Sequence, residues 1–430
     1  LNQNTTGADN TGIGCSALTA NTTGAYNVAV GHRALLANTT GGSNIAIGVA
    51  ALSTQTSGGD NNVAVGHFAL AANTTGDNCV AVGYNALNDN TTGGSNVAIG
   101  YNALALNTTG SSNVAVGRNA LDAATTVDYN VAIGYYALTA NTTGNQNVAV
   151  GYAALEDCTT GASNTTIGME AGRNLTTGSN NIAIGKNSLD GVVTGDYNTA
   201  IGVLAMQSNT SGHNNVAVGN CMTSNTTGAQ NTALGNSALN ANTTSSFNTA
   251  VGNSALAANT TGSFMTAVGY EALNDNTTGQ YNTAVGGRAL DLNTTGSYNT
   301  AMGVNALGAT TTADNNTAVG YAALLANTTG TQNAAFGSTA LDANTTGSHN
   351  TAFGTNALSA NTTASGSTAV GEDALFTNTG AQNTAMGQSA LRLNSTGTQN
   401  VAIGPNSLST QTTANYNTAV GYAALEDNTA

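Results

Sequence analysis

Cysteine and histidine are the side chains whose spacing most directly predicts a metal site or a nucleophilic catalyst. This chain of 430 residues has four of each, and both kinds are scattered along it. Metal ligands must converge within about 2–2.5 Å of one ion. Side chains spread so far apart along the chain are not expected to converge in this way. We therefore predict no metal site, no disulfide framework and no cofactor. The residues concerned are Cys15, Cys79, Cys158, Cys221, His32, His67, His213 and His349.

Carboxylates are the other candidates for chemistry. The pair Glu372 and Asp373 stands at a position where residue types vary freely, and Asp60, Asp77 and Asp314 fall in turn-like segments without a calcium-binding nonapeptide. A catalytic site needs a nucleophile, a base and an orienting group within hydrogen-bond reach of one another. No Ser–His–Asp or Cys–His grouping recurs at neighbouring positions, so we predict that the protein is not an enzyme.

These scattered residues are set in a repeat that accounts for nearly the whole chain. The unit is Asn-Val-Ala-Ile-Gly at residues 96–100, followed by Tyr-Asn-Ala-Leu at 101–104 and Asn-Thr-Thr-Gly at 107–110. Its first glycine, called the anchor below, recurs every 17 residues from Gly14 to Gly421, with one interval of 18 and two of 16, which makes 25 anchors. Self-similarity at a fixed period is typical of a stacked repeat array.

The residues before each anchor alternate with period two, which predicts a β-strand. Asn stands four before the anchor, Ala two before it, and bulky apolar or β-branched residues stand three and one before it. Neither set varies as a solvent-exposed face would, so we expect both faces of the strand to be packed. Leu in the following Ala-Leu step forms a second core column. The residues that we expect to carry the fold are Asn96, Asn113, Ala98, Leu104, Leu121, Gly31, Gly100, Gly117, Gly252 and Gly320.

The Asn-Thr-Thr-Gly segment predicts a turn in which Asn and Thr cap local backbone groups and Gly adopts a positive φ. A helix is disfavoured because Thr-Thr-Gly would interrupt it every 17 residues. We predict an all-β fold, a parallel β-solenoid of about 25 coils with two short strands in each. The array is expected to run without a break over residues 1–430, with uncapped ends at Leu1 and Ala430. Asn side chains should stack into a ladder along it.

Tyrosine also follows the repeat. Seven of the 14 tyrosines come directly after an anchor, and six more stand five residues before one. Tyr84 with Tyr101, and Tyr135 with Tyr152, lie one repeat apart and could stack on neighbouring coils. Stacking could stiffen the edge of the coil, or the row could contact a sugar or another surface, since exposed Tyr is favoured in recognition.

The residue three before the anchor changes type along the chain. Early repeats mostly carry Val or Ile, as at Val28 and Val97, whereas from Thr232 onward nearly all carry Thr. The change keeps the β-branched shape and adds a hydroxyl. It is explained either by drift between duplicated blocks or by a different partner along the second half.

Charge and hydropathy exclude two classes of partner. The chain has six basic and 20 acidic residues, a net charge of −14, and the basic residues are far apart. Nucleic-acid binding needs a clustered positive surface, so we predict none. No apolar run approaches the ~18–20 residues that span a bilayer, so we predict no membrane insertion.

Asn-Val-Ala-Val-Gly and Asn-Thr-Ala-Val-Gly, each followed by Ala-Leu, resemble the head repeats of trimeric autotransporter adhesins. The whole unit with Asn-Thr-Thr-Gly is still more similar to repeat arrays of phage-type tail-fibre proteins and related bacterial surface proteins. The resemblance covers essentially all 430 residues. It implies a left-handed parallel β-roll that trimerises, although the coil here is longer than in the adhesin heads.

These observations predict a non-enzymatic structural fibre or adhesin shaft that is extracellular, on a cell surface or on a virion. It would space or present contacts to a host surface or glycan, as a homotrimer. The alternative is a filament subunit that stacks end to end. A third class, ice binding through Thr ladders, is less favoured because Thr-Thr falls in a turn rather than on a flat strand.

Overall fold

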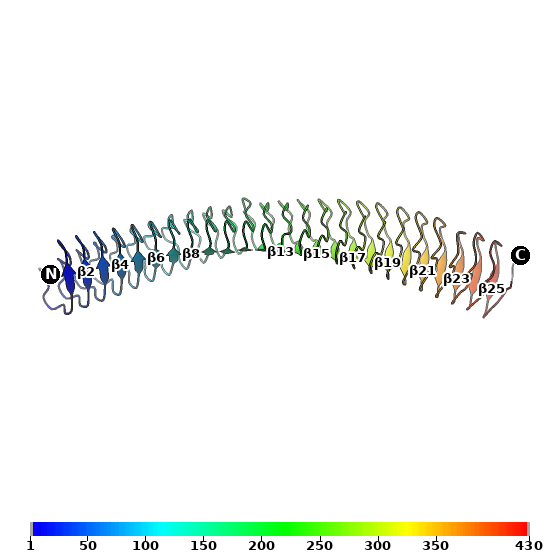
Figure 1. The fold of residues 1–430 in the computed structure, drawn as a ribbon, viewed down its shortest axis with the longest axis horizontal. Coiled ribbons are helices and arrows are strands. Elements are labelled where there is room, and N and C mark those ends of the chain that lie inside the picture. The colour runs from blue at the N-terminus through cyan, green and yellow to red at the C-terminus, as the bar shows by residue number, and fades with distance from the viewer. Residues whose placement is uncertain (1–2, 428–430) are drawn as a thin grey trace. The chain divides into compact units, whose positions relative to one another are not determined.

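The computed structural model describes residues 3–427, so Leu1 and Ala430, where we expected uncapped ends, lie outside the described residues. Within residues 3–427 the structure contains 25 strands of three residues and no helix. The chain divides into two compact units, Leu1–Asn215 and Val216–Ala430. Each unit is a parallel β-solenoid with one strand per coil, which confirms the predicted fold class (Figure 1).

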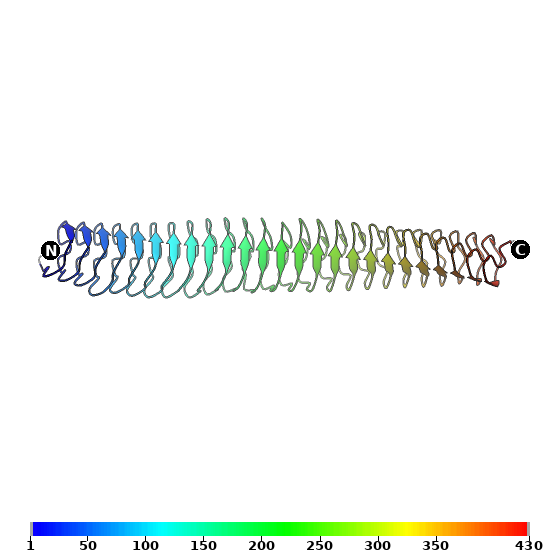
Figure 2. The same cartoon turned by 90° about the horizontal axis from the view of Figure 1, so that it is seen from below.

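The first unit contains twelve strands that pair in parallel, each with the strand of the next coil (Figure 2). Their bounds are β1 Thr11–Ile13, β2 Val28–Val30, β3 Ile45–Ile47, β4 Val63–Val65, β5 Val80–Val82, β6 Val97–Ile99, β7 Val114–Val116, β8 Val131–Ile133, β9 Val148–Val150, β10 Thr165–Ile167, β11 Ile182–Ile184 and β12 Thr199–Ile201.

The second unit contains thirteen strands that pair in the same way. Their bounds are β13 Val216–Val218, β14 Thr232–Leu234, β15 Thr249–Val251, β16 Thr266–Val268, β17 Thr283–Val285, β18 Thr300–Met302, β19 Thr317–Val319, β20 Ala334–Phe336, β21 Thr351–Phe353, β22 Thr368–Val370, β23 Thr384–Met386, β24 Val401–Ile403 and β25 Thr418–Val420.

The strands stay in register even where the repeat length changes. Ile45 of β3 pairs with Val63 of β4 across the interval of 18, and Thr368 of β22 pairs with Thr384 of β23 across an interval of 16. The extra or missing residue is therefore absorbed outside the strand, as expected of a stacked coil.

The inner face of each strand is made of small residues. Ala98 of β6 is fully buried, whereas its neighbours Val97 and Ile99 are only partly covered, and Ile99 is 39 % exposed. The same alternation recurs in nearly every strand. The prediction that both strand faces are packed is therefore wrong for the chain itself, because the inward strand position holds a small residue, nearly always Ala, and the bulky side chains point outward.

The prediction of a second strand at Ala-Leu is also wrong. Leu104 and Leu121 are fully buried, as expected of a core column, but their φ angles are 51° and 54°. A left-handed residue cannot belong to an extended strand. The segment is instead a series of turns held to the next coil by single hydrogen bonds, such as the Leu104 amide donating to the Ala120 carbonyl at 2.9 Å.

Two buried asparagine ladders run along each unit. In the predicted ladder, the Asn113 amide donates to Oδ1 of Asn96 at 2.9 Å, and Nδ2 of Asn113 donates to the Val127 carbonyl at 2.7 Å. The second ladder uses the Asn of the turn, as where Nδ2 of Asn107 donates to Oδ1 of Asn90 at 2.8 Å. The predicted local cap is present, because Nδ2 of Asn107 donates to the Gly110 carbonyl at 2.9 Å. The sequence did not predict that this Asn is also fully buried and forms a ladder.

Glycine is required at two positions of the repeat, the anchor and the end of the turn, because adjacent coils approach each other closely there. At the anchor Gly100, φ is 136° and an added Cβ would lie 2.5 Å from the Gly117 carbonyl oxygen. At the turn glycine Gly24, a Cβ would lie 2.3 Å from the Gly41 carbonyl oxygen, but φ is not positive there. The prediction of a positive φ at the turn glycine is therefore wrong: steric contact with the next coil, not φ, excludes a side chain.

One coil departs from the pattern at two positions that compensate each other. Thr166 replaces the inner Ala of β10, and Gly172 replaces the core Leu of the same coil. A Cβ on Gly172 would lie 2.8 Å from Cγ2 of Thr166. The threonine methyl therefore occupies space that the leucine fills in other coils.

This pair predicts strong coupling between two substitutions. Gly172→Leu alone overfills the core and should cost about 1–3 kcal/mol, and Thr166→Ala alone leaves a void. The double variant rebuilds the usual Ala and Leu columns, so its melting temperature, followed by circular dichroism, should equal or exceed that of the parent. Additive losses in the double variant would refute the compensation.

Cys79 interrupts the first Asn ladder, so we expect that replacing it by Asn stabilises the protein. Its Sγ lies 3.4 Å from the Gly93 carbonyl, where other coils place an amide donor. Cys79→Asn should supply that donor and an acceptor for the Asn96 amide, which adds about 1 kcal/mol. The melting temperature should rise. Cys15→Asn at an exposed position is the control and should change it little; equal effects of both would contradict the ladder argument.

Candidate functional site

The tyrosines that we singled out lie on one side of the first unit, directly after the anchors. Tyr84 and Tyr101 stack with ring centroids 5.2 Å apart and planes 10° apart, and Tyr135 and Tyr152 stack at 5.6 Å and 6°. All four are exposed. The predicted stacking on neighbouring coils is therefore present, because in-register coils place identical positions above one another.

Arg118 joins these two pairs, which sequence reasoning missed. Its Cζ lies 5.4 Å from the ring of Tyr101 and 5.7 Å from the ring of Tyr135. His67 extends the series beyond Tyr84, with the two ring centroids 5.5 Å apart and the planes 82° apart, an edge-to-face contact. The signal was available, because Arg118 stands 17 residues after Tyr101 and 17 before Tyr135. We call the resulting series the tyrosine row: His67, Tyr84, Tyr101, Arg118, Tyr135 and Tyr152.

The outward sheet face of the first unit is apolar. From β2 to β9 every strand carries Val or Ile on both sides of its inner Ala, and these side chains are half-buried or exposed. No charged residue interrupts them. We call this surface the apolar stripe: Val28, Val30, Ile45, Ile47, Val63, Val65, Val80, Val82, Val97, Ile99, Val114, Val116, Val131, Ile133, Val148 and Val150.

The outward sheet face of the second unit is different. From β14 to β19 the first strand residue is Thr in every coil, half-buried, while the third stays apolar. The Val-to-Thr change in the sequence therefore alters an outer surface and leaves the interior unchanged. The Thr residues of the turn have another role: the Thr22 hydroxyl donates to the Thr39 carbonyl of the next coil at 2.9 Å.

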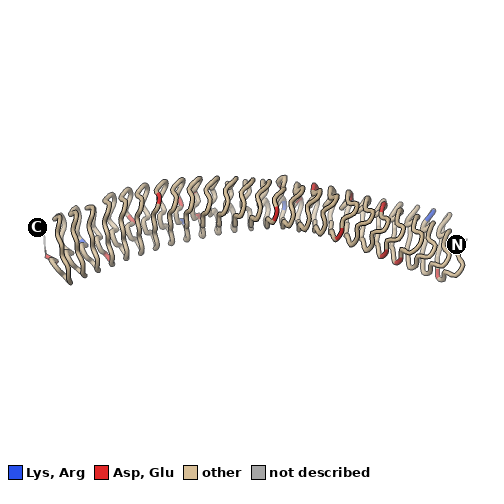
Figure 3. Tube along the Cα trace, turned by 180° about the vertical axis from the view of Figure 1, so that it is seen from behind, with Lys and Arg blue, Asp and Glu red and all other residues tan. Residues whose placement is uncertain are grey.

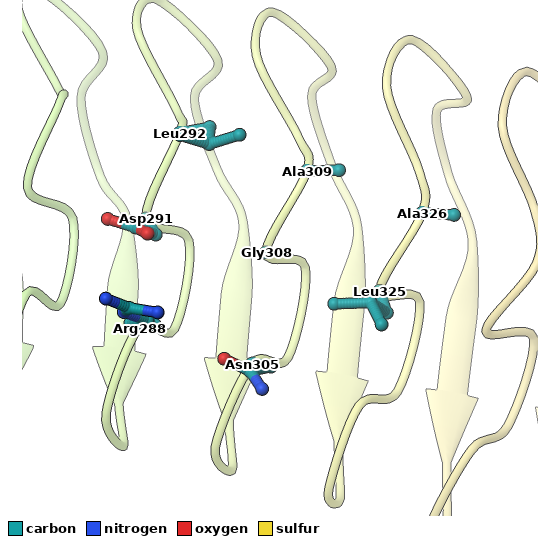
Figure 4. Close-up of a pocket in the computed structure, with 8 residues that line it drawn as sticks. All are labelled: Arg288, Asp291, Leu292, Asn305, Gly308, Ala309, Leu325 and Ala326. Carbon is teal, nitrogen blue, oxygen red and sulfur yellow. The ribbon is translucent and has the colours of Figure 1, made fainter.

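A shallow pocket of about 340 Å³ lies in the second unit (Figure 4). It exists because Gly308 has no side chain where the neighbouring coils carry Asp291 and Leu325. Two charged residues line it, Arg288 and Asp291, and Arg288 is already engaged because its Nε lies 2.8 Å from Glu271. The wall residues are Arg288, Asp291, Leu292, Asn305, Gly308, Ala309, Leu325 and Ala326.

Charged residues are few and are spread over both units (Figure 3). Some of them pair: Arg173 lies 3.8 Å from Glu156 and 3.7 Å from Glu170, and Arg392 lies 3.4 Å from Asp373. Next to Arg288, hydrogen bonds from Tyr270 and Arg288 lower the pKa of Glu271. Partial burial raises the pKa of Asp291 on the neighbouring coil. Within residues 3–427 no three His, Cys, Asp or Glu side chains gather where they could hold a metal ion.

The cysteines contribute no site. All four are free, and Cys79, Cys158 and Cys221 are buried in positions where other coils place small or polar residues. Burial raises the pKa of Cys158 to about 11 and that of Cys221 to about 12. A thiol is nucleophilic only as the thiolate, so these groups are inert packing residues.

The Asn-x-Thr sequences of the turns are also unavailable for glycosylation in the folded chain. The asparagine that would carry the sugar, such as Asn107 or Asn141, is fully buried. Its Nδ2 donates within the coil, at 2.9 Å to Gly110 for Asn107 and 2.8 Å to Gly144 for Asn141. The turn Asn is therefore a structural residue.

Thiol titration tests this assignment. At pH 8 the folded protein should react quickly with Ellman's reagent at Cys15 alone, because this thiol is exposed and the other three are buried with raised pKa values. Unfolding in guanidinium should release all four. Two or more fast thiols in the folded protein would show that the coils open.

No protein-family model matches this chain, and no curated protein matches it either. Among residues 3–427 no helix is long and apolar enough to cross a membrane. The functional argument therefore rests on geometry: a hydrogen-bonded interior that repeats in nearly every coil, and outer surfaces that differ between coils.

Proposed function

We propose that the protein is a non-enzymatic structural shaft, extracellular or virion-borne, that holds surface contacts at fixed spacing. Its buried polar side chains support this role, because they bond to the next coil instead of converging on a ligand. Hydrogen bonds of this kind to the adjacent coil are made by Asn96, Asn113 and Asn130. In such arrays stability is a sum of coil and interface terms, which suits a part whose role is mechanical.

The observation that carries the proposal is the apolar stripe. It crosses eight strands, β2 to β9, and successive parallel strands lie about 4.8 Å apart, so it is about 34 Å long. Monomeric proteins rarely leave a contiguous apolar surface of this kind in water. Ile45, Ile47, Ile99 and Ile133 are each about 40 % exposed on it. We infer that another chain covers the stripe.

The occupant that fits best is a second copy of this chain, within a homo-oligomer such as a trimer. A copy has the same spacing between coils, so its own side chains can fit between the rows of the stripe along its whole length. Charge supports this choice. The chain carries a net charge of −14, which opposes association in general, but the stripe carries no charge.

Light scattering on a matched pair of variants tests the proposal. Ile99→Lys places a charge in the middle of the stripe and should reduce an oligomer to monomers, because burying an unpaired charge is costly. Thr92→Lys adds the same charge at an exposed turn position and should leave the mass unchanged. A parent protein that is monomeric at micromolar concentration, or equal masses for both variants, would refute association through the stripe.

A filament that grows end to end is the second candidate. Within residues 3–427, β1 pairs with β2 and β25 pairs with β24. The outer edge of a parallel sheet is a template on which a strand of another chain can add. In this case mass should rise with protein concentration without reaching a fixed value. Ile99→Lys would leave that growth unaffected.

A further inference from the structure

Four aromatic rings stack in succession on the second unit, five residues before the anchors of β15 to β18. The centroids of Phe247 and Phe264 are 4.7 Å apart, those of Phe264 and Tyr281 are 5.2 Å apart, and those of Tyr281 and Tyr298 are 5.1 Å apart. The planes are within 7° of parallel. We call these four residues the aromatic row.

The aromatic row is exposed as well as stacked. The four side chains are between 45 and 59 % exposed, although burying such rings is strongly favourable. Parallel rings at these separations are offset from one another, so each leaves an edge and part of a face open to solvent. Stacking therefore buries only part of the apolar surface of each ring.

These rings also stand where the backbone disfavours them. Their φ angles lie between 56° and 64°, a left-handed conformation that suits Gly, Asn and Asp and is unfavourable for bulky residues. In most other coils the same position carries Asn, Ser or Gln, and in four it carries a single Tyr without an aromatic residue at that position in the adjacent coil: Tyr26, Tyr129, Tyr197 and Tyr416. Four aromatic residues in succession at this unfavourable φ indicate that a continuous row of exposed rings is needed here.

The surroundings of the aromatic row are neutral and carry hydroxyls. Two residues further along the same four coils are Thr249, Thr266, Thr283 and Thr300, all half-buried on the outward sheet face. The charged residues of these coils, Glu271, Asp275, Arg288 and Asp291, all come after the anchor, and Glu271 pairs with Arg288. Between each ring and its anchor no residue is charged. This part of the surface therefore offers aromatic rings beside hydroxyl groups without a charged side chain among them.

We propose that the aromatic row and its four threonines bind a neutral polysaccharide chain lying along the coils. Sugar rings have apolar C–H faces that stack on aromatic rings, and hydroxyls that bond to Thr and Tyr. Coils about 4.8 Å apart repeat at nearly the length of one sugar unit. Each coil then adds one weak contact, and several such contacts acting together give useful affinity. This inference goes beyond the structural role and does not require self-association.

Affinity electrophoresis of the full chain tests it, in native gels containing hydroxyethyl cellulose, mannan or dextran, with anionic alginate as the charged comparison. At least one neutral polymer should retard the parent protein. Replacing all four rings by Asn, a residue that the fold already uses at this position, should weaken retardation by about tenfold or more, which is about 1.4 kcal/mol. The matched control is Tyr26→Asn with Tyr129→Asn, which removes two exposed, unstacked rings at the same position of the repeat and should bind like the parent.

Several results would overturn the proposal. They are no retardation by any of the three neutral polymers, equal retardation of the four-ring variant, or stronger retardation by alginate. A loss of mass in light scattering when the rings are replaced would assign the row to contacts between copies of the chain instead. Ile99→Lys should bind like the parent, so failure of the shaft proposal and failure of this one are distinguishable.

Discussion

The constraint on which this structure depends is the close approach of each coil to the next. An added Cβ at an anchor or turn glycine would lie well inside contact distance of the following coil's carbonyl oxygen. At this separation every buried amide lies beside its counterpart one repeat away. Asparagine is therefore suited to the interior, because it is donor and acceptor at once and can satisfy the chain on both sides. The inner residues are uniform because each one packs against the residue at the same repeat position in the adjacent coil.

Much of this could be predicted from the sequence, because the period and alternation are local signals. The parallel solenoid, the buried Ala and Leu columns and the first Asn ladder followed directly. The predictions that were wrong concerned backbone conformation and the direction in which side chains point. Leu104 at a positive φ is not recognisable, since leucine rarely adopts it. The outward orientation of Val97 and Ile99 was missed because a uniform column suggests burial, whereas here the inward position of the strand is the one occupied by alanine.

The candidate surfaces were less predictable than the fold. The stacking of Tyr84 on Tyr101 followed from their spacing, but Arg118 between two tyrosine pairs was found only in the structure. The aromatic row is less evident in the sequence because it mixes Phe with Tyr. In both cases the solenoid turns one position of the repeat into a line of side chains. The composition of each line depends on outer residues that the interior does not constrain.

The pairing of Thr166 with Gly172 shows how self-contained a coil is. The larger inner residue Thr166 is compensated by the missing side chain of Gly172 in the same coil. The adjoining strands β9 and β11 keep their register with β10. A gene built in this way can gain or lose whole 17-residue units by unequal recombination, and each exchange joins ends that already fit. Reach could then evolve by copy number alone, separately from the surfaces that the coils display.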